Sequence, residues 1–372
     1  MRRAGGGSDA NWRARVRLQL GVMRGDDIGL EVVPEVVAVL QAATAAEPDI
    51  EFVFHDLPVG WTSYMEHGHT LPSSTLDRLP EMDGLVLGPI GHAAYPKDRP
   101  ECVNPHPIIR KRFDLFANLR PAKSYPTLDS LHDDVDIVIV RENNEGFQPD
   151  RNMVAGCGEF QPNTESSFSI RVITRSQSER IAQAAFKLAR QRGGKRRVTA
   201  IHKRTVFKLT DGMFMDAVAR VAEEYPDIDL DDYQVDTFAM HLAMRPQQFD
   251  VVLCTNLFGD ILSDEAAGLV GGLGMAPGLS AGDELAMAQA THGSAPEIAG
   301  RGIANPYAMI MSAKMLLEWL AAHLRAEALA RAARRIDRAV EASISEGKYL
   351  TPDLGGTAST HEMGNAIAEA CA

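Results

Sequence analysis

Two aspartates stand four residues apart where an apolar run passes into a helical pattern. The segment FDVVLCTNLFGDILSDEA (249–266) predicts a strand over 249–254 and a helix over 256–270 that carries Asp260 and Asp264 on one face. Ligands of α/β proteins gather at the carboxyl ends of strands, and carboxylate oxygens are preferred ligands of Mg²⁺ and Mn²⁺. The pair is a candidate metal site. The alternative is two acids that simply suit a helix N-terminus.

Two arginines close apolar strand-like segments. Arg120 follows FANL and precedes a proline, and Arg141 ends the strand predicted over 135–140. A guanidinium at the end of a buried strand is itself partly buried and requires an anionic partner. The two residues therefore predict a pocket for a carboxylic acid. The basic run 110–112 by itself predicts only a solvated helix face.

Lys203 ends another predicted strand, residues 197–202, in the sequence IHKRT. A lysine beside a divalent cation and arginines gives up its proton more readily, which suits a general base at neutral pH. The alternative is a surface lysine in a basic cluster with Arg204.

A long loop of small residues, HGSAPEIAGRGIANP, covers 292–306. Such a loop brings backbone close to a flat or phosphorylated ligand, although a plain long turn is the alternative. No G-x-G-x-x-G follows a predicted strand, and the nearest approach, GLGMAP at 272–277, has proline in place of the third glycine. The sequence therefore does not favour a Rossmann nucleotide site, and any nucleotide is expected to be held in another way.

The elements that would position these residues alternate between strand and helix, which predicts an α/β fold with a largely parallel, covered sheet. Residues 306–346 are almost purely helical, and the polar segment 150–169 is expected to form an exposed arm or a dimer-forming ribbon. Strands are predicted at 16–23, 51–55, 84–87, 135–140, 197–202 and 249–254, and helices at 31–46, 176–191, 210–224 and 256–270.

Composition limits the class of protein. The 372 residues suffice for two to three domains, and a net charge of −12 argues against a nucleic-acid binder. No apolar run approaches the ~20 residues needed to cross a bilayer, so no membrane partner is expected. The four cysteines lack CxxC spacing, and residues 1–15 lack the apolar core of a signal peptide. These features predict a cytoplasmic protein with a flexible leader over 1–15.

Taken together, the motifs resemble those of the β-decarboxylating dehydrogenases, the family of isopropylmalate, isocitrate, homoisocitrate and tartrate/D-malate dehydrogenases. The resemblance extends from Val16 to Ile367 and rests on eight motifs in the family's order: GDDIG, FANLRP, VRENNEG, IHK, VD at 235–236, TNLFGDILSDEAA, HGSAPEIAGRGIANP and TPDLGG. It implies an isopropylmalate dehydrogenase-like two-domain, open-sheet fold. The first domain would comprise 16–115 and 268–372, and the inserted second domain 116–267, with a dimer arm at about 150–169.

The resemblance also implies roles for single residues in a site shared by two subunits of a homodimer. Lys203 would be the base that takes the C2 hydroxyl proton, the arginines would clamp the carboxylates of a hydroxy di- or tricarboxylate, and the aspartates would hold Mg²⁺ or Mn²⁺. Lys203 and Asp236 would come from the second subunit. The implied clamp is Arg110, Arg120 and Arg141, and the implied metal ligands are Asp236, Asp260 and Asp264.

By the same resemblance, the loop at 292–306 would bind NAD. The carboxylate of Glu297 would accept hydrogen bonds from the ribose hydroxyls and repel a 2′-phosphate, which favours NAD over NADP. The implied cofactor residues are His292, Gly293, Ser294, Ala295, Pro296, Glu297, Ile298 and Asn305. The implied reaction is the oxidative decarboxylation of a 3-substituted D-malate-type acid, with a 3-isopropylmalate-like acid favoured.

Some positions depart from the family's pattern. Gln148 stands where a proton-donating tyrosine is usual, Thr205 replaces an asparagine, and Asp27 replaces the central glycine of GDGIG. His106 and Pro107 stand where isopropylmalate enzymes have two leucines, so the 3-substituent is left open. Two alternatives follow: a catalytically impaired paralogue that binds such acids as a regulatory subunit, and a dehydrogenase without efficient decarboxylation.

Overall fold

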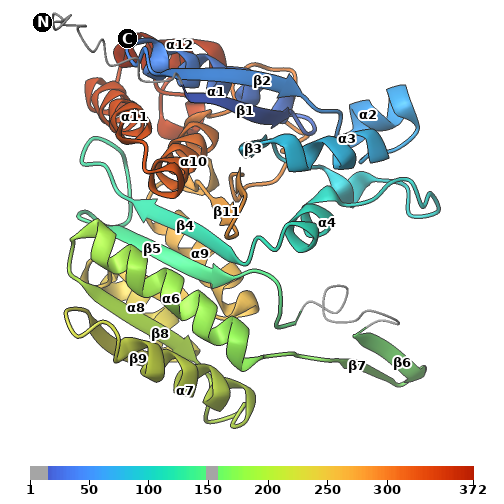
Figure 1. Cartoon of the computed structure of the whole chain (residues 1–372), viewed down its shortest axis with the longest axis vertical. Helices are drawn as coiled ribbons and strands as arrows, with labels where there is room; N and C mark the ends of the chain where they lie inside the picture. The colour runs from blue at the N-terminus through green and yellow to red at the C-terminus, as the bar shows by residue number, and fades with distance from the viewer. Residues whose placement is uncertain (1–15, 148–157) are drawn as a thin grey trace, which may run out of the picture.

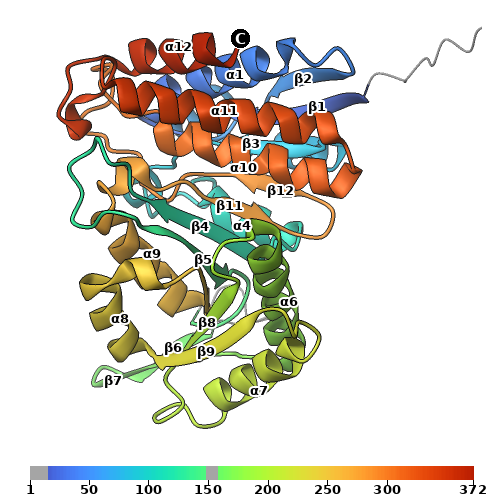
Figure 2. The same cartoon turned by 90° about the vertical axis from the view of Figure 1, so that its left-hand side faces the viewer.

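The computed structural model describes residues 16–147 and 158–372. In this part of the chain one ten-stranded sheet, in the order β2-β1-β3-β12-β11-β4-β5-β10-β8-β9, runs through the molecule with helices on both faces (Figures 1 and 2). Its strands are β1 Val16–Met23, β2 Ile50–Asp56, β3 Gly84–Leu87, β4 Ala117–Lys123, β5 Asp136–Glu142, β8 Arg197–His202, β9 Asp229–Gln234, β10 Val251–Cys254, β11 Leu279–Ala281 and β12 Ala286–Ala288.

The helices cover the sheet in groups. At one end α1, α10, α11 and α12 lie together, whereas at the other end α6 and α7 lie on one side of the strands and α8 and α9 on the opposite side (Figure 2). The helices are α1 Gly29–Ala45, α2 Gly60–His67, α3 Ser73–Arg78, α4 Pro105–Arg112, α6 Arg175–Arg192, α7 Thr210–Ala222, α8 Val235–Met244, α9 Asn256–Leu269, α10 Tyr307–Leu324, α11 Glu327–Glu346 and α12 Thr360–Cys371.

The sheet is mixed. Pairing is parallel towards both ends and antiparallel through the middle, where β12, β11, β4 and β5 lie side by side. The expectation of a largely parallel sheet therefore holds for the ends only. Strands β11 and β12 have three residues each, too few to produce a recognisable alternation in the sequence. Strand β9 was not predicted because its sequence, DLDDYQ, is acidic, as is common for a strand at a sheet edge.

Buried apolar side chains form separate clusters. One packs α1, α10, α11 and α12 against β1, and it draws on both ends of the chain. A second lies under α2, α3 and α4. Two more fill the spaces between the strands β5, β8 and β10 and the helices on either face, α6 and α7 on one and α8 and α9 on the other. The inner strands at each end are thus buried on both faces, as their apolar runs predict, whereas the edge strands β2 and β9 are partly exposed.

The described part of the predicted arm is a two-stranded antiparallel ribbon that projects away from the sheet (Figure 1). Its strands are β6 Glu159–Asn163 and β7 Ser166–Ser169. The remainder of the arm, the position Gln148 and the predicted leader over 1–15 lie outside the described residues. Within residues 16–147 and 158–372, no helix is long and apolar enough to cross a membrane.

Candidate active site

Arg120 and Arg141 converge on one carboxylate. Arg120, on β4, and Arg141, on β5, both donate to Oδ1 of Asp260 on α9, at 2.9 and 2.6 Å. Arg120 also lies 3.8 Å from Oδ1 of Asp264, one turn further along the helix. The two guanidiniums are almost fully buried, whereas about half of each carboxylate side chain is exposed. The cluster therefore presents acidic oxygens to solvent over a fixed cationic base.

Neighbouring polar groups fix both guanidiniums. Arg120 Nε donates to Asn118 at 2.7 Å, and Arg141 donates from Nε to the Asn256 carbonyl at 3.0 Å and from Nη2 to the Asn256 side chain at 2.8 Å. Helix α9 approaches β5 closely because residue 259 is glycine. A Cβ there would lie 2.7 Å from the Cβ of Arg141. These contacts give the arginines the rigidity that an acid clamp requires.

Asp260 and Asp264 suit a divalent cation by the chemistry of their oxygens. Burial raises the pKa of Asp264 above its ordinary value; Arg120 opposes this rise and the Asp260 carboxylate adds to it. Two carboxylates held this close gain from a cation between them. Among the described residues of one chain, no group of three or more His, Cys, Asp and Glu is arranged to hold a metal. A metal site built on this pair would need donors from elsewhere.

Lys203 forms an ion pair with Asp236, the residue predicted to join Asp260 and Asp264 as a metal ligand. Its Nζ lies 2.7 Å from Asp236 Oδ1 at the start of α8, and this hydrogen bond is the main cause that lowers the pKa of Asp236. The preceding residue is also held from β9, because His202 Nε2 lies 2.7 Å from Asp232 Oδ2. Acidic side chains thus hold the end of β8 in place. Lys203 forms an ion pair and is not an isolated surface lysine.

Arg110 is buried, unlike its neighbours Lys111 and Arg112, which are exposed. It lies in the last turn of α4, and its Nη2 donates to Gln289 Oε1 at 2.8 Å, just beyond β12. The basic run alone predicted a solvated helix face, which is wrong for Arg110. The resemblance-based role of this residue in an acid clamp agrees better with its burial.

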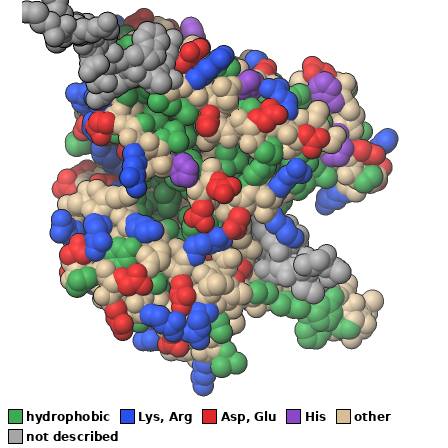
Figure 3. Space-filling model, in the orientation of Figure 1, with side chains coloured by type: hydrophobic (Ala, Val, Ile, Leu, Met, Phe, Trp, Pro, Cys, Tyr) green, Lys and Arg blue, Asp and Glu red, His purple; other side chains and the backbone are tan. Residues whose placement is uncertain are grey.

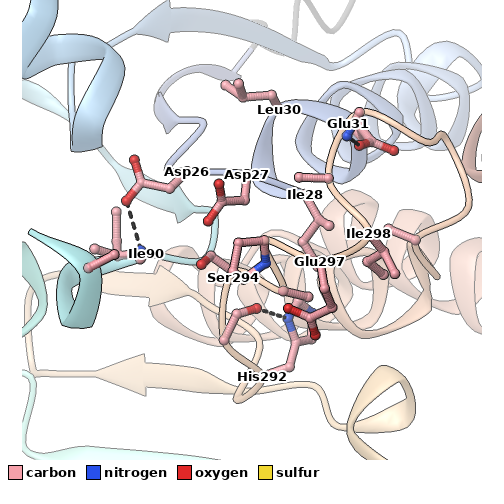
Figure 4. Close-up of a pocket in the computed structure, with 18 of the residues that line it drawn as sticks. Asp26, Asp27, Ile28, Leu30, Glu31, Ile90, His292, Ser294, Glu297 and Ile298 are labelled. Carbon is pink, nitrogen blue, oxygen red and sulfur yellow. Dashed lines mark hydrogen bonds between the residues drawn. The ribbon is translucent and has the colours of Figure 1, made fainter.

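A cavity of about 1400 Å³ lies between the start of α1, the loop after β3 and the 292–305 loop (Figure 4). It exceeds the range usual for small-ligand pockets. Every predicted cofactor residue lines it: His292, Gly293, Ser294, Ala295, Pro296, Glu297, Ile298 and Asn305. The residues predicted to bind the cofactor thus lie together at one cavity, and the lining also includes Trp61 and Tyr95, which were not predicted.

Two polar side-chain atoms at this cavity are free to form hydrogen bonds with a ligand. His292 Nε2 and Glu31 Oε2 are buried without a hydrogen-bond partner among the described residues. Burial lowers the pKa of His292, against the opposing effects of the Gly293 carbonyl and Asp353, so the ring is neutral at pH 7. The other Glu31 oxygen accepts the Gly300 N–H at 2.6 Å and tethers the loop to α1. These groups suit the polar edges of a nucleotide.

Two of the departures from the family's pattern lie within the described residues. Asp27 adopts a φ of 49°, a left-handed conformation that glycine prefers and aspartate tolerates, and its side chain points into the cavity (Figure 4). The exposed Thr205 donates to Gln234 Oε1 at 2.7 Å. Gln148 lies outside the described residues.

The acids of the VRENNEG motif have structural partners. The Glu142 carboxylate accepts the N–H groups of Asn144 and Glu145 at 2.9 and 2.8 Å. Glu145 accepts from the backbone N–H of Thr174 at 3.0 Å and from its hydroxyl at 2.8 Å, at the start of α6. Burial raises the pKa of Glu145 to about 7, and the nearby Glu142 adds to the rise. The motif therefore ties the loop after β5 to α6.

Glu145→Gln is expected to stabilise the protein at pH 8. The folded-state pKa lies above the ordinary value of 4.5, so stability falls as pH rises from about 4.5 to about 7, and the ionised carboxylate is unfavourable above that range. Glutamine keeps an acceptor for Thr174 and carries no charge, which predicts a gain of about 1 to 3 kcal/mol at pH 8 and little gain near pH 4.5. Urea unfolding at both pH values measures it; equal or lower stability of the variant at pH 8 contradicts the prediction.

Fold and site together define an α/β protein in which a cluster of buried arginines and half-exposed aspartates accompanies a large cavity lined by a small-residue loop. A family model described as "Isocitrate/isopropylmalate dehydrogenase" matches residues 19–367. The chain belongs to this family and is an oxidoreductase of its β-decarboxylating class, as the resemblance predicted.

Relatives and a solved structure support the assignment. The chain is 42% identical over 351 residues to 3-isopropylmalate dehydrogenase of Methanothermobacter thermautotrophicus, covering 94% of this chain and 98% of the relative. It is 40% identical over 350 residues to isocitrate/homoisocitrate dehydrogenase of Thermus thermophilus, covering 94% and 97%. The crystal structure of isocitrate dehydrogenase from Methylococcus capsulatus superposes with a TM-score of 0.82 at 38% identity, covering 95% of this chain and 99% of the other. The predicted fold class is confirmed, whereas the names of the relatives divide between different acids.

Proposed function

We propose that this protein catalyses the NAD- and Mg²⁺- or Mn²⁺-dependent oxidative decarboxylation of a 3-substituted D-malate-type acid, with a 3-isopropylmalate-like acid favoured. The observation that carries the proposal is the convergence of the buried Arg120 and Arg141 on the half-exposed Asp260. A fixed cationic surface beside solvent-facing carboxylate oxygens suits an acid and a divalent cation bound side by side.

Within this proposal the arginines orient the substrate. Planar guanidiniums bind carboxylates bidentately, and Arg120 and Arg141 are already held in place by Asn118 and Asn256. Arg110 would contribute from α4. Since all three are buried, little conformational freedom is lost when the acid binds.

Lys203 would take the proton from the 2-hydroxyl during oxidation at C2, for which NAD would supply the hydride acceptor. The 3-carboxylate of the resulting β-keto acid would then leave as CO₂, and the enolate that it leaves behind would take up a proton. When bound by Asp236, Asp260 and Asp264, a divalent cation would polarise the hydroxyl and carboxylate oxygens. Glu297 is exposed at the cavity (Figure 4). Its carboxylate would accept hydrogen bonds from the ribose hydroxyls of NAD and would repel the 2′-phosphate of NADP.

The proposal includes a homodimer in which each site combines Asp260 and Asp264 of one subunit with Lys203 and Asp236 of the other. It is supported by apolar side chains that are exposed on α8 and α9, namely Met240, Met244, Leu257 and Ile261. On the ribbon, the half-exposed rings of Phe160 and Phe168 stack at 5.2 Å, and hydrophobic side chains gather there in Figure 3. The separate apolar clusters support the proposed division into a first domain, 16–115 with 268–372, and an inserted domain, 116–267, although the first cluster also includes Tyr125 and Leu128.

The test is a panel of isopropylmalate, isocitrate, homoisocitrate, tartrate and D-malate with NAD⁺ or NADP⁺ and Mn²⁺, followed by absorbance at 340 nm and by CO₂ release. One acid is expected to give NADH and CO₂ in equal amounts, with NAD⁺ preferred. Absence of turnover with every acid contradicts the proposal.

The position of Gln148 supports a second candidate, a paralogue that binds these acids without turnover as a regulatory subunit. Calorimetric binding of an acid or NAD⁺ without NADH formation favours it, and turnover excludes it. A third outcome, accumulation of a β-keto acid without CO₂, identifies a dehydrogenase with impaired decarboxylation.

Glu297→Gln is expected to lower the ratio of kcat/KM for NAD⁺ to kcat/KM for NADP⁺ about tenfold. The amide accepts hydrogen bonds from the ribose hydroxyls more weakly than a carboxylate does, and it does not repel a 2′-phosphate. The measurement is kcat/KM for both cofactors. Glu284→Gln, an exposed acid that does not line the cavity, is the matched control. An unchanged cofactor ratio in Glu297→Gln contradicts the assignment.

A further inference from the structure

Arg171 is a buried arginine outside the proposed acid clamp. It follows β7, and its side chain is only 7% exposed. Its Nη1 lies 2.6 Å from Oδ1 of the fully buried Asp211 and donates to Thr210 at 2.8 Å, and Nη2 donates to Thr255 at 3.2 Å. Burying an arginine costs free energy unless its charge is paired and its N–H groups are hydrogen-bonded. Here Asp211 pairs with the charge, and the hydroxyls of Thr210 and Thr255 accept hydrogen bonds.

Three phenylalanines surround the same guanidinium. Its carbon lies 5.6 Å from the ring centre of Phe147, 4.8 Å from that of Phe207 and 5.6 Å from that of Phe258. Each ring belongs to a different part of the proposed site: the loop after β5, the segment after Lys203 and the first turn of α9. Cation–π contacts hold these segments to one planar group.

Asp211 connects Arg171 to Lys203. Asp211 Oδ2 accepts the backbone N–H of Lys203 at 2.5 Å, while the Lys203 carbonyl accepts the N–H groups of Val206 and Phe207 at 2.9 Å each. The backbone of Lys203 is thus fixed from both sides. The other Asp211 oxygen, Oδ1, forms the ion pair with Arg171, so one buried carboxylate joins Arg171 to the Lys203 backbone.

Thr255 extends the connection to the helix of the proposed metal ligands. It directly precedes α9, on which Asp260 and Asp264 lie. One guanidinium therefore contacts the start of α7 and the residue before α9 directly, and it reaches the end of β8 through Asp211.

We propose that Arg171, acting through Asp211, is a positioning residue that holds the Lys203 backbone in the place the proton transfer requires. The inference rests on the proposed function only for the role of Lys203. Arg171 contacts neither cavity nor acid clamp, so its loss should lower kcat rather than raise KM.

The test compares Arg171→Lys with Arg180→Lys. Arg180 also pairs with a carboxylate, Asp114, and also lies over a ring, that of Phe116, but its hydrogen bonds go to Asp114 and Gln177 rather than to the segment around Lys203. Lysine keeps the charge and cannot bridge Asp211, Thr210 and Thr255 together. We expect Arg171→Lys to lower kcat at least tenfold, with KM for acid and NAD⁺ within about threefold, and Arg180→Lys to leave kcat within twofold.

Hydrogen exchange of the amides at 203–210 gives a readout that needs no substrate. In Arg171→Lys these amides are expected to exchange at least tenfold faster, while those of α11 are unchanged. Unchanged protection at 203–210 overturns the inference whatever the activity of the wild type, so its failure is distinct from failure of the proposed function. An equal loss of kcat in Arg180→Lys, or a raised KM with unchanged kcat in Arg171→Lys, overturns it as well. If the lysine variant is unstable, the double variant Arg171→Met with Asp211→Asn is measured in its place. It leaves no buried charge unpaired, and the same results support or overturn the inference.

Discussion

Lys203→Met is expected to lower kcat about 10³- to 10⁴-fold, since this is the upper range that a positioned general base contributes. The Nζ of Lys203 is held 2.7 Å from Asp236, and its backbone is fixed by Asp211. Methionine fills a similar volume without the amine, so binding of acid and cofactor should change little. The measurement is kcat and KM for the best acid of the panel.

The stability of this variant should match the wild type, because the Asp236 carboxylate left behind is mostly exposed and water can solvate it. Lys208→Met removes an exposed lysine from the same segment and is the control. A Lys203→Met protein that retains more than a tenth of the wild-type kcat shows that another group is the base.

Residues whose sequence position fixes their environment were predictable. Arg141 lies next to last in β5, and a guanidinium at the end of a buried strand requires an acidic partner. Arg120 was expected at a strand end as well, which is wrong, because β4 continues to Lys123 and places Arg120 in the middle of the strand. Its predicted burial and acidic partner are nevertheless present. The pair Asp260 and Asp264 is fixed by the helical period. These inferences require only local pattern, and the structure brings all four residues together.

Residues whose role depends on distant contacts were not predictable. The burial of Arg110 depends on Gln289, which reaches it from beyond β12. Arg171 belongs to none of the motifs, and its three phenylalanines come from separate parts of the chain. The sequence could not reveal either environment, because long-range pairing sets both.

The basic residues of the proposed site contrast with the negative charge of the whole chain. The chain carries −12 overall, yet the arginines and the lysine of the proposed site lie within or beside the fold's interior, each against an acid or amide. The overall negative charge opposes nonspecific binding of polyanions, whereas a carboxylic acid entering the proposed site would meet arginines.

Asp264→Asn is expected to weaken Mn²⁺ binding about 100-fold and to lower kcat/KM to a similar extent, because one of the charged oxygen donors becomes a neutral amide. Asp264 is a better probe than Asp260, which accepts from both buried arginines and whose loss would leave two charges unpaired. Stability should be unchanged or slightly higher, since burial and Asp260 already raise the pKa of Asp264 and the amide removes that repulsion.

Glu265→Gln provides the matched control for this variant. Glu265 is the next residue of α9, and burial raises its pKa too, so the two substitutions remove similarly placed charges from one helix. Titration of Mn²⁺ by electron paramagnetic resonance, without substrate, should show weaker binding in Asp264→Asn only, and kcat/KM should recover partly at high Mn²⁺. If both variants bind Mn²⁺ as the wild type does, α9 does not carry the metal. If both lose affinity equally, the helix contributes general negative charge rather than a specific oxygen from Asp264.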